Sequence, residues 1–511
     1  MRALISVSDK SGIIAFAKSL IECGYEIVST GGTLKTLSKN GVPVTPVDAV
    51  TDFPEILDGR VKTLHPHVHG GLLAVRDNKD HMRTCKLHGI SLIDLLVVNL
   101  YPFEKTISQP NVKLDDAIDN IDIGGPSMLR SAAKNYQSVG VIVNPDRYDS
   151  VITELRDNKG TLSLSMKEKL ACEAFSHTAN YDTMIWEFLN DRLNRDSEQY
   201  IPLKQLSLKK QNKLRYGENP HQSAAFYKIS GQSGIPDLVQ HHGKSLSYNN
   251  IIDLEAAALI VNELDLPAAA IIKHSNPCGV AMADTVHLAY LNAYNSDPVS
   301  AFGSIIGLNR TVNKQTAEEI AKTFVEVVVA PGFDKEALKV LQKKSALRLI
   351  ELPQFDQVGR GHYYRYVSGG FLVQSCDDRR VAKSELAFPT SLNPDAKRIN
   401  DLLFANTIVK YVKSNAIVVA KEGVILGVGA GQMSRIEAVE LALKKAGDRA
   451  KGAVLASDAF FPFGDSVRLA HASGIQSIIQ PGGSKRDDES ITFCNEVGMS
   501  MIFSGVRHFR H

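Results

Sequence analysis

Short apolar runs alternate with helical patterns along residues 1–185. The apolar runs are Leu4–Val7, Glu26–Val28, Leu95–Val98 and Val139–Val143, and the clearest helical patterns are Ile13–Cys23 and Ser127–Asn135. Runs of this length rich in β-branched residues are typical of buried strands, whereas apolar residues three and four apart are typical of helices. The alternation predicts βαβ units, and therefore a parallel sheet with helices on both faces.

The pattern changes after a polar, charge-rich stretch at residues 190–213, which we interpret as a linker. Beyond it, Ser296–Gly303 and Ser457–Gly464 both fit S-D-x-x-x-x-F-G at a spacing of 161 residues. A strand-like run, a glycine turn and a helical pattern (Asp284–Tyr294 or Ser434–Ala446) precede each copy. The matching order predicts two similar α/β lobes between residue ~200 and the C-terminus.

Composition narrows the class of protein. A chain of 511 residues is too long for one hydrophobic core, so two to four domains are expected. Its net charge of +2, with no long Lys/Arg block, does not favour nucleic acid binding. No apolar run approaches the ~20 residues that span a membrane, and the strand-like start is unlike a signal peptide.

The six cysteines are scattered and contain no C-x-x-C pair. This usage indicates reduced thiols and argues against a disulfide framework or structural zinc. We therefore expect a cytoplasmic protein that binds neither nucleic acid nor membrane.

Two loops near the N-terminus indicate a phosphate site. Ser29–Thr33 (STGGT) joins a strand to a helical pattern, so its glycines and hydroxyls direct donors toward a helix N-terminus that favours an anion. Ser6–Lys10 repeats this arrangement after the first strand, with Ser8 and Lys10 at the same sheet edge. A plain strand–helix turn is the alternative for either loop alone.

Two further segments contain candidate chemistry. In Gly59–Gly71, Arg60 and Lys62 suit an anionic substrate. Three alternating histidines, at positions 65, 67 and 69, would share one face of an extended segment, which leaves a metal site open beside a phosphate-binding or structural loop. In Asn120–Lys134, a glycine turn enters a helix, and Asp122 and Lys134 are candidate acid/base groups or surface ion-pair partners.

The apolar run Ala268–Ile272 ends at Lys273 and His274. The pattern predicts a buried strand that presents a cation and a base at its carboxyl end, the edge where ligands bind in open α/β sheets. A histidine satisfied by a backbone carbonyl beside a surface lysine is the alternative.

The next residues, Pro277–Cys278, resemble part of the zinc deaminase signature. That signature also needs a second cysteine where Ala281 stands and a glutamate where Asn276 stands, so catalytic zinc is not expected. Cys278 as a nucleophile remains open.

Taken in order, the motifs resemble the bifunctional enzymes of purine biosynthesis that combine AICAR (phosphoribosylaminoimidazolecarboxamide) transformylase with IMP cyclohydrolase. The resemblance runs through essentially the whole chain. It rests on SVSDK at 6–10, STGGT at 29–33, RVKTLHP at 60–66, NLYPF at 99–103, IDIGG at 121–125, LRYGENPHQ at 214–222, KHSNPCG at 273–279, SNAI at 414–417, QPGGS at 480–484 and the terminal RHFRH at 507–511.

The resemblance implies an α/β fold in two domains. Residues 1–198 would form a methylglyoxal-synthase-like cyclohydrolase domain with a parallel sheet. Residues 199–511 would form the transformylase domain, built from two similar cytidine-deaminase-like lobes at about 199–375 and 376–511. The resemblance also implies a homodimer with transformylase sites at the subunit interface.

The resemblance further implies roles for individual residues. In the transformylase, His274 would be the base, Lys273 and Asn415 would stabilise the intermediate and the leaving folate, and Arg215, Tyr216, Phe302, Gly303 and Arg507 would bind substrate. In the cyclohydrolase, Lys62, Tyr101, Asp122 and Lys134 would surround the reacting ring, and Ser8, Lys10, Thr30, Gly31, Gly32, Thr33, Arg60 and Thr63 would bind the ribotide. The co-substrate would be 10-formyltetrahydrofolate, with no catalytic metal.

Two alternatives of other classes remain. A non-catalytic nucleotide-sensing protein would bind a ribotide without turnover and would leave Lys273 and His274 without a role. A metal-dependent deaminase would contain stoichiometric zinc.

Overall fold

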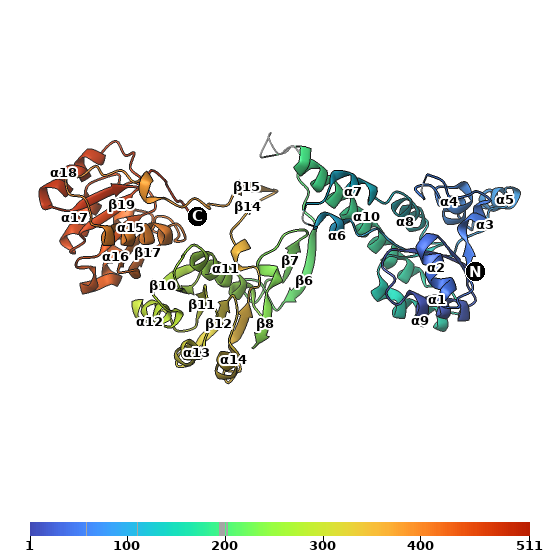
Figure 1. The fold of residues 1–511 in the computed structure, drawn as a ribbon, viewed down its shortest axis with the longest axis horizontal. Coiled ribbons are helices and arrows are strands. Elements are labelled where there is room, and N and C mark those ends of the chain that lie inside the picture. The colour runs from blue at the N-terminus through green and yellow to red at the C-terminus, as the bar shows by residue number, and fades with distance from the viewer. Residues whose placement is uncertain (58, 110, 194–199, 201–202) are drawn as a thin grey trace. The chain divides into compact units, whose positions relative to one another are not determined.

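The computed structural model describes all residues except 58, 110, 194–199, 201 and 202. Backbone contacts divide the chain into two compact units, Met1–Ser207 and Leu208–His511 (Figure 1). Part of the expected linker lies outside the described residues. The expected linker begins within helix α10 (Leu164–Leu193) and ends within strand β6 (Leu208–Leu214), so both of its ends have secondary structure.

The first unit is built around a five-stranded parallel sheet in the order β3-β2-β1-β4-β5. Its strands are β1 (Arg2–Val7), β2 (Glu26–Ser29), β3 (Thr45–Pro46), β4 (Leu95–Asn99) and β5 (Gly140–Ile142). Its remaining helices are α1 (Ile13–Glu22), α2 (Gly31–Lys39), α3 (Val47–Thr51), α4 (Pro66–Leu73), α5 (Lys79–Leu87), α6 (Phe103–Ile107), α7 (Leu114–Asp119), α8 (Gly124–Lys134), η1 (Pro145–Arg147) and α9 (Tyr148–Asp157).

Most residues of strands β1, β2, β4 and β5 are buried, as is typical of a parallel sheet between helices, whereas edge strand β3 is not buried. Four of the five residues of β4 are buried, and so are all three of β5. The predicted strands and helices of residues 1–185, and the parallel sheet that they imply, are confirmed. Because β1 continues to β2 on one side while β4 lies on the other, the strand order reverses beside β1, which is where such sheets bind ligands.

The second unit contains an eleven-stranded sheet in the order β20-β19-β18-β16-β17-β10-β9-β11-β12-β13-β8. Its strands are β8 (Val239–His242), β9 (Ala268–Lys273), β10 (Asn276–Met282), β11 (Ser304–Leu308), β12 (Val325–Ala330), β13 (Arg348–Glu351), β16 (Ile417–Lys421), β17 (Val424–Gly429), β18 (Val454–Ser457), β19 (Ser477–Gln480) and β20 (Ser500–Phe503). The helices are α11 (Tyr248–Asn262), α12 (Val286–Ser296), α13 (Lys314–Ile320), α14 (Lys335–Leu341), α15 (Ala396–Val409), α16 (Arg435–Ala446), α17 (Asp465–Ala472) and α18 (Asp487–Val497), with 3-10 turns η2 (Ile235–Asp237), η3 (Phe355–Gln357), η4 (Lys383–Glu385) and η5 (Gly447–Ala450).

Two halves of this sheet repeat one topology. The elements from α11 to β13 recur as α15 to β20, and each half orders its five strands 2-1-3-4-5, counted along the chain. The halves join where β10 pairs antiparallel with β17. The predicted pair of similar lobes is therefore confirmed.

The two S-D-x-x-x-x-F-G segments that suggested the repeat do not occupy equivalent positions in the two lobes. β9 begins at 268 and β16 at 417, an offset of 149 residues, whereas the two S-D-x-x-x-x-F-G segments are 161 apart. The first echo connects α12 to β11, but the second follows β18 and leads into α17. The similarity of those eight residues is therefore not a consequence of their place in the repeat.

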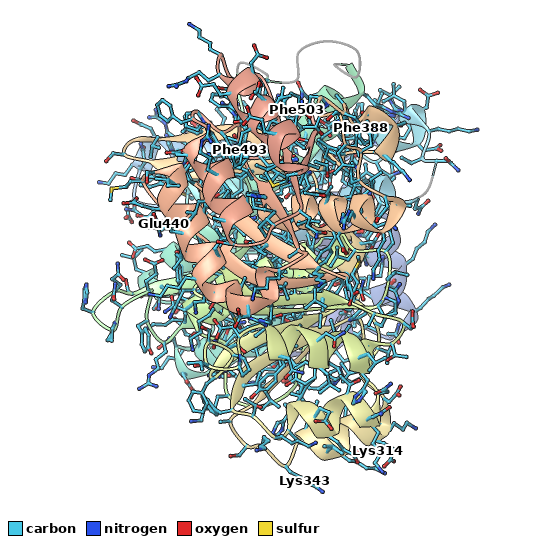
Figure 2. The ribbon with its side chains drawn as sticks, turned by 90° about the vertical axis from the view of Figure 1, so that its left-hand side faces the viewer. Lys314, Lys343, Phe388, Glu440, Phe493 and Phe503 are labelled. Carbon is cyan, nitrogen blue, oxygen red and sulfur yellow. The ribbon has the colours of Figure 1, made fainter. Side chains whose placement is uncertain are left out.

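Two hairpins lie outside the large sheet. They are β6 with β7 (Ala224–Ile229), and β14 (His362–Val367) with β15 (Gly370–Ser375), each a separate two-stranded sheet (Figure 1). The segment before α15 lies along the outer strand β20, where Ala387 and Phe503 exchange two backbone hydrogen bonds, so Phe388 and Phe503 lie close together (Figure 2). Among the described residues, no helix is long and apolar enough to cross a bilayer.

Candidate active sites

A cavity of about 790 Å³ lies at the carboxyl ends of β1, β2 and β4 in the first unit. The predicted cyclohydrolase residues that line it come from five separate segments: Ser8, Lys10, Thr30, Gly31, Gly32, Thr33, Arg60, Lys62, Thr63, Tyr101 and Asp122. Strands that run in parallel bring their following loops to one edge of the sheet. The fold therefore gathers these residues, which span more than 110 positions of sequence.

Two lysines converge on the glycines at the start of α2. A Cβ built on Gly31 would lie 3.6 Å from Lys62 Nζ, and one on Gly32 would lie 3.8 Å from Lys10 Nζ. Gly31 has φ +45°, a conformation that L side chains rarely adopt. Free N–H groups at the first turn of a helix and two ammonium groups beside them attract an anion such as a phosphate.

Hydroxyls and one amide side chain hold these loops in register. Thr33 Oγ1 accepts a hydrogen bond from Val7 N and donates one to Val7 O, each at 3.0 Å. Asn99 Oδ1 accepts from Ser8 N (2.7 Å) and Asp9 N (2.9 Å). The Thr33 hydroxyl is therefore committed to the protein, so its contribution to a ligand would come from its backbone N–H.

The start of α8 forms another wall of the cavity. Asp122 Oδ1 accepts from Gly125 N at 2.8 Å, and Asp122 N donates to Tyr181 Oη at 2.8 Å. Burial raises the pKa of the Asp122 carboxyl, and this effect outweighs the opposing hydrogen bonds from the backbone of Gly125 and Tyr101 and the charge of Lys62. A carboxyl with a raised pKa beside a lysine is suited to proton transfer.

Lys134 is not brought to this cavity. It is exposed in the last turn of α8, whereas Gly124 and Gly125 at the first turn line the cavity. Ten residues of helix separate the two ends by roughly 15 Å. Helix α8 begins at the cavity and its last turn lies away from it. Lys134 therefore does not line the cavity beside Asp122.

The three-histidine segment is helical, and not extended. Helix α4 begins at Pro66, His65 Nδ1 accepts from His67 N, and His69 Nδ1 lies 3.0 Å from Ser131 Oγ. Residues two apart on a helix do not share a face, so the alternation does not converge on one ion. Across the described residues, no group of three or more His, Cys, Asp or Glu is placed to hold a metal ion.

In the second unit, Lys273 and His274 lie at a tight hairpin between β9 and β10. Lys273 Nζ donates to Phe302 O (2.8 Å) and Gly303 O (3.0 Å), so the predicted Lys273, Phe302 and Gly303 lie together. His274 is exposed at the tip, with φ +51°. A cation and an imidazole are therefore presented at one end of the strand.

The predicted buried strand with Lys273 and His274 at its carboxyl end is present as β9, but its neighbours are not parallel to it. β9 runs antiparallel to both of its neighbours, β10 and β11. Its carboxyl end therefore lies beside the amino ends of β11 and β12. An apolar run of five residues cannot distinguish the two orientations, because central strands of both kinds are buried on both faces.

Asn415 belongs to a buried polar network in the second lobe. Its Oδ1 accepts from Arg435 Nη2 at 2.7 Å, and its Nδ2 donates to the carbonyls of Gln432 (3.0 Å) and Met433 (3.2 Å). Arg435 in turn pairs with Asp458, whose side chain is fully buried, at 2.5 Å. This network was not predicted from the sequence, because Arg435 and Asp458 stand 23 positions apart without a local motif.

The hairpin with His274 and the network with Asn415 meet at the junction of the lobes. Asn276 Oδ1 accepts from Lys413 N (3.3 Å), and Asn276 Nδ2 donates to His274 O (3.1 Å). Lys413 is two positions from Asn415. The roles of Asn276 and Asn99 were also not predicted, although an asparagine at a strand end is a recognisable signal for a loop-fixing side chain.

The remaining predicted residues are not joined to this hairpin. Arg215 lies over the ring of Tyr216 at 5.6 Å, and Arg507 over Phe509 at 4.5 Å. Both arginines are exposed, and no described hydrogen bond or ion pair links either to Lys273 or His274. Cys278 packs beside the core of the first lobe, and burial raises the pKa of its thiol to about 12. This pKa disfavours the thiolate that a nucleophilic cysteine needs.

Comparisons with known proteins identify the family. The sequence pattern of the AICARFT/IMPCHase bienzyme family matches residues 132–445, and that of the MGS-like domain matches residues 12–127. The bifunctional purine biosynthesis protein PurH of Oceanobacillus iheyensis is 50% identical over 512 residues, covering 100% of this chain and 99% of its own. PurH of Thermoanaerobacter sp. is 51% identical over 511 residues, covering 100% and 99%.

A solved structure described as the crystal structure of ForH is 34% identical, covers 37% of this chain and 97% of its own, and has a TM-score of 0.35. The family pattern extends over more than half of the chain, and half of the residues are identical to those of full-length relatives. The chain therefore belongs to the AICARFT/IMPCHase bienzyme family.

Proposed function

We propose that the two reactions of this family are divided between the two units. As a member of the family, the chain transfers a formyl group from 10-formyltetrahydrofolate to AICAR and then cyclises formyl-AICAR to IMP with loss of water. Membership of this family does not favour either alternative function, a non-catalytic nucleotide-sensing protein or a metal-dependent deaminase. Residues 1–198 are proposed to close the ring, and residues 199–511, with lobes at about 199–375 and 376–511, to transfer the formyl group.

The cavity of the first unit is the observation that carries the cyclohydrolase assignment. It combines a two-lysine anion site at Gly31 and Gly32 with a half-buried carboxyl, Asp122. A ribotide phosphate would bind the glycine turn, and the ring would lie toward Asp122, Lys62 and Tyr101. The carboxamide nitrogen then attacks the formyl carbon, a new C–N bond forms, and the formyl oxygen leaves as water after protonation.

Formyl transfer is assigned to the hairpin of the second unit. The amine of AICAR attacks the formyl carbon while His274 accepts the amine proton. Lys273, held by two carbonyls with one ammonium N–H left to donate, stabilises the tetrahedral oxyanion. The bond to the folate nitrogen then breaks, and that nitrogen takes up a proton. Asn415 would act near the leaving folate, and Arg215, Tyr216 and Arg507 would bind the ribotide.

We propose that the active form is a homodimer, with transformylase sites completed across the interface. Hairpin β14–β15 exposes Tyr363, Tyr366, Phe371 and Leu372, each at least 50% exposed. An isolated hairpin with so much apolar surface is marginally stable in water. A second copy is its proposed cover. Replacing Tyr366 and Phe371 with Ser should shift the mass measured by sedimentation to the monomer and lower formyl transfer, and an unchanged dimer would reject this role.

A cytoplasmic location is also proposed. Its support is the set of six free cysteines among the described residues, which suits a reducing compartment.

Reciprocal variants test the division of the reactions. His274→Ala should reduce formyl transfer from 10-formyltetrahydrofolate to AICAR by about 10²- to 10⁴-fold, the usual contribution of a general base, and leave cyclisation of supplied formyl-AICAR unchanged. Asp122→Asn should reduce cyclisation of supplied formyl-AICAR and leave formyl transfer unchanged. Tetrahydrofolate release and IMP formation are measured separately on each folded variant. Loss of both reactions in either variant would contradict separate sites.

A further inference from the structure

The hairpin turn that bears His274 has an unfavourable backbone. His274 and Ser275 form a two-residue turn between β9 and β10, with φ of +51° and +61°. Histidine, like asparagine and aspartate, is enriched in this left-handed region, but Ser275 is not of a type that adopts it readily. Such a conformation persists only where neighbouring groups hold it in place.

Asp253 on helix α11 supplies that restraint. Its Oδ1 accepts a hydrogen bond from Ser275 N at 2.7 Å and another from Ser275 Oγ at 3.3 Å. Ser275 directly follows His274, and His274 follows Lys273 without an intervening residue. Asp253 therefore fixes the backbone of Ser275, the residue directly after the two that are proposed to hold the oxyanion and transfer the proton.

The second lobe contains the same restraint without those side chains. Asp401 on α15 accepts from Glu422 N and Gly423 N, each at 2.9 Å, in the turn between β16 and β17. Asp253 and Asp401 are 148 residues apart, which is also the offset between the starts of β10 at 276 and β17 at 424. The two aspartates therefore occupy equivalent places in the repeat.

The two equivalent turns differ in the side chains that they carry. In the second lobe the restrained turn carries Glu422 and Gly423, and Gly423 adopts its φ of +70° without strain. In the first lobe the turn carries His274 and, in place of the glycine, Ser275, whose hydroxyl makes an additional bond to Asp253. The shared aspartate belongs to the fold, but only in the first lobe does it direct a proposed catalytic pair.

We propose that Asp253 is a positioning residue for formyl transfer. Its carboxylate oxygen holds the left-handed turn, and the turn directs the His274 imidazole and places Lys273 Nζ against the carbonyls of Phe302 and Gly303. The inference rests on the proposed function of Lys273 and His274. Asp253 itself needs only to accept hydrogen bonds, so a neutral acceptor of the same shape should replace it.

Three full-length variants test the proposal. Asp253→Ala removes the acceptor and should lower kcat for formyl transfer by about 10- to 100-fold, the effect of misplacing a reacting group by about 1 Å, with smaller changes in the KM of both substrates. Asp253→Asn keeps an oxygen acceptor and should retain formyl transfer within about threefold of the native rate. Asp401→Ala, the matched control, should lower the melting temperature by a similar amount and leave formyl transfer unchanged.

The pH profile distinguishes positioning from a charge effect. If Asp253 acts through geometry, Asp253→Ala lowers the rate at every pH and leaves the position of the acid limb unchanged. A shift of that limb, an Asp253→Asn variant as slow as Asp253→Ala, or equal losses of formyl transfer in Asp253→Ala and Asp401→Ala would each overturn the proposal. Cyclisation of supplied formyl-AICAR, measured on the same samples, should be native in all three.

His274→Ala, run in parallel, separates the two hypotheses. If it leaves formyl transfer intact, the proposed function of the hairpin fails. If it abolishes formyl transfer while Asp253→Ala does not, only the positioning role fails.

Discussion

At the scale of single residues, the two sites hold their lysines differently. Lys62 Nζ has one carboxylate partner, Glu55, at a distance of 3.8 Å, whereas Lys273 Nζ is tied to two backbone carbonyls at 2.8 and 3.0 Å. Neutral carbonyls fix an ammonium group in place without cancelling its charge. Lys273 is therefore placed for a short-lived oxyanion, while Lys62 can move toward an incoming anion.

The pH dependence of cyclisation should reflect Asp122. Because burial raises the pKa of this carboxyl above its ordinary 3.8, its ionised fraction falls at a higher pH than that of an exposed aspartate. If the carboxylate is the base, kcat/KM for formyl-AICAR should decline with acidification from above pH 3.8. The check is the pH–rate profile of cyclisation, with Asp122→Asn as the control that lacks this limb.

The same shift has a consequence for stability. The folded protein binds the Asp122 proton more tightly than the unfolded chain does, so ionising this group opposes folding. Its contribution to the free energy of unfolding therefore decreases as pH rises through the interval between its unfolded and folded pKa values. Asp122→Asn should remove that decrease, and an equal pH dependence of stability in both proteins would contradict it.

At the scale of elements, the repeated lobes depend on close contact between a strand and a helix. Gly279 in β10 and Gly427 in β17 are 148 residues apart, the same offset as the strands themselves. A Cβ on Gly279 would lie 2.0 Å from Ala293 O of α12, and one on Gly427 would lie 2.0 Å from Ala442 O of α16. The obstacle is backbone in both cases, so it cannot move aside as a flexible side chain would.

Either glycine should therefore resist substitution. Gly279→Ala or Gly427→Ala should destabilise the second unit by about 1–3 kcal/mol or more, the range for overpacked cores, because the helix must separate from the sheet. Urea unfolding with a probe in each unit measures the effect, and the first unit should retain its native midpoint. Gly370→Ala, where no atom lies within 4 Å of the added Cβ, is the matched control.

At the scale of the whole molecule, the chain holds two compact units with separate cores. The first contains the buried cluster around Leu4, Leu96 and Leu129, and the second contains its own clusters around both faces of the large sheet. Residues near the boundary belong to the first unit, since Thr183 on α10 donates to Gln205 at 2.9 Å. Separate cores allow the two reactions to reside on independently folded parts.

The first unit should therefore fold and act alone. A fragment of residues 1–207 should show cooperative unfolding and convert formyl-AICAR to IMP at a rate within a few-fold of that of the full chain. Circular dichroism and IMP formation provide the measurements. A folded fragment without activity would mean that the second unit completes the cyclohydrolase site, contrary to the proposed division.

The fold of the first unit was largely predictable because its signals are local. Each strand is a short apolar run, each connection is a helix, and the parallel arrangement follows from that alternation. Thr30 and Lys10 follow neighbouring strands, so both were expected at one sheet edge, and both line the cavity there. Lys134 does not line this cavity, because helix α8 separates it from Asp122 although the two are close in sequence, and its role stays a prediction.

For the second unit, the family, the existence of two similar lobes and the position of Lys273 and His274 at a strand end all follow from the residues alone. The folded chain was needed to show that β9 is antiparallel to its neighbours, that the repeat offset is near 149 and not 161, and that Asp253 and Asn276 hold the turn. Strand direction and contacts between distant residues depend on long-range pairing, which leaves no periodic trace in the residues that form it. Buried apolar runs and ordered motifs, in contrast, can be recognised from neighbouring residues, because the structure and chemistry that they indicate are local.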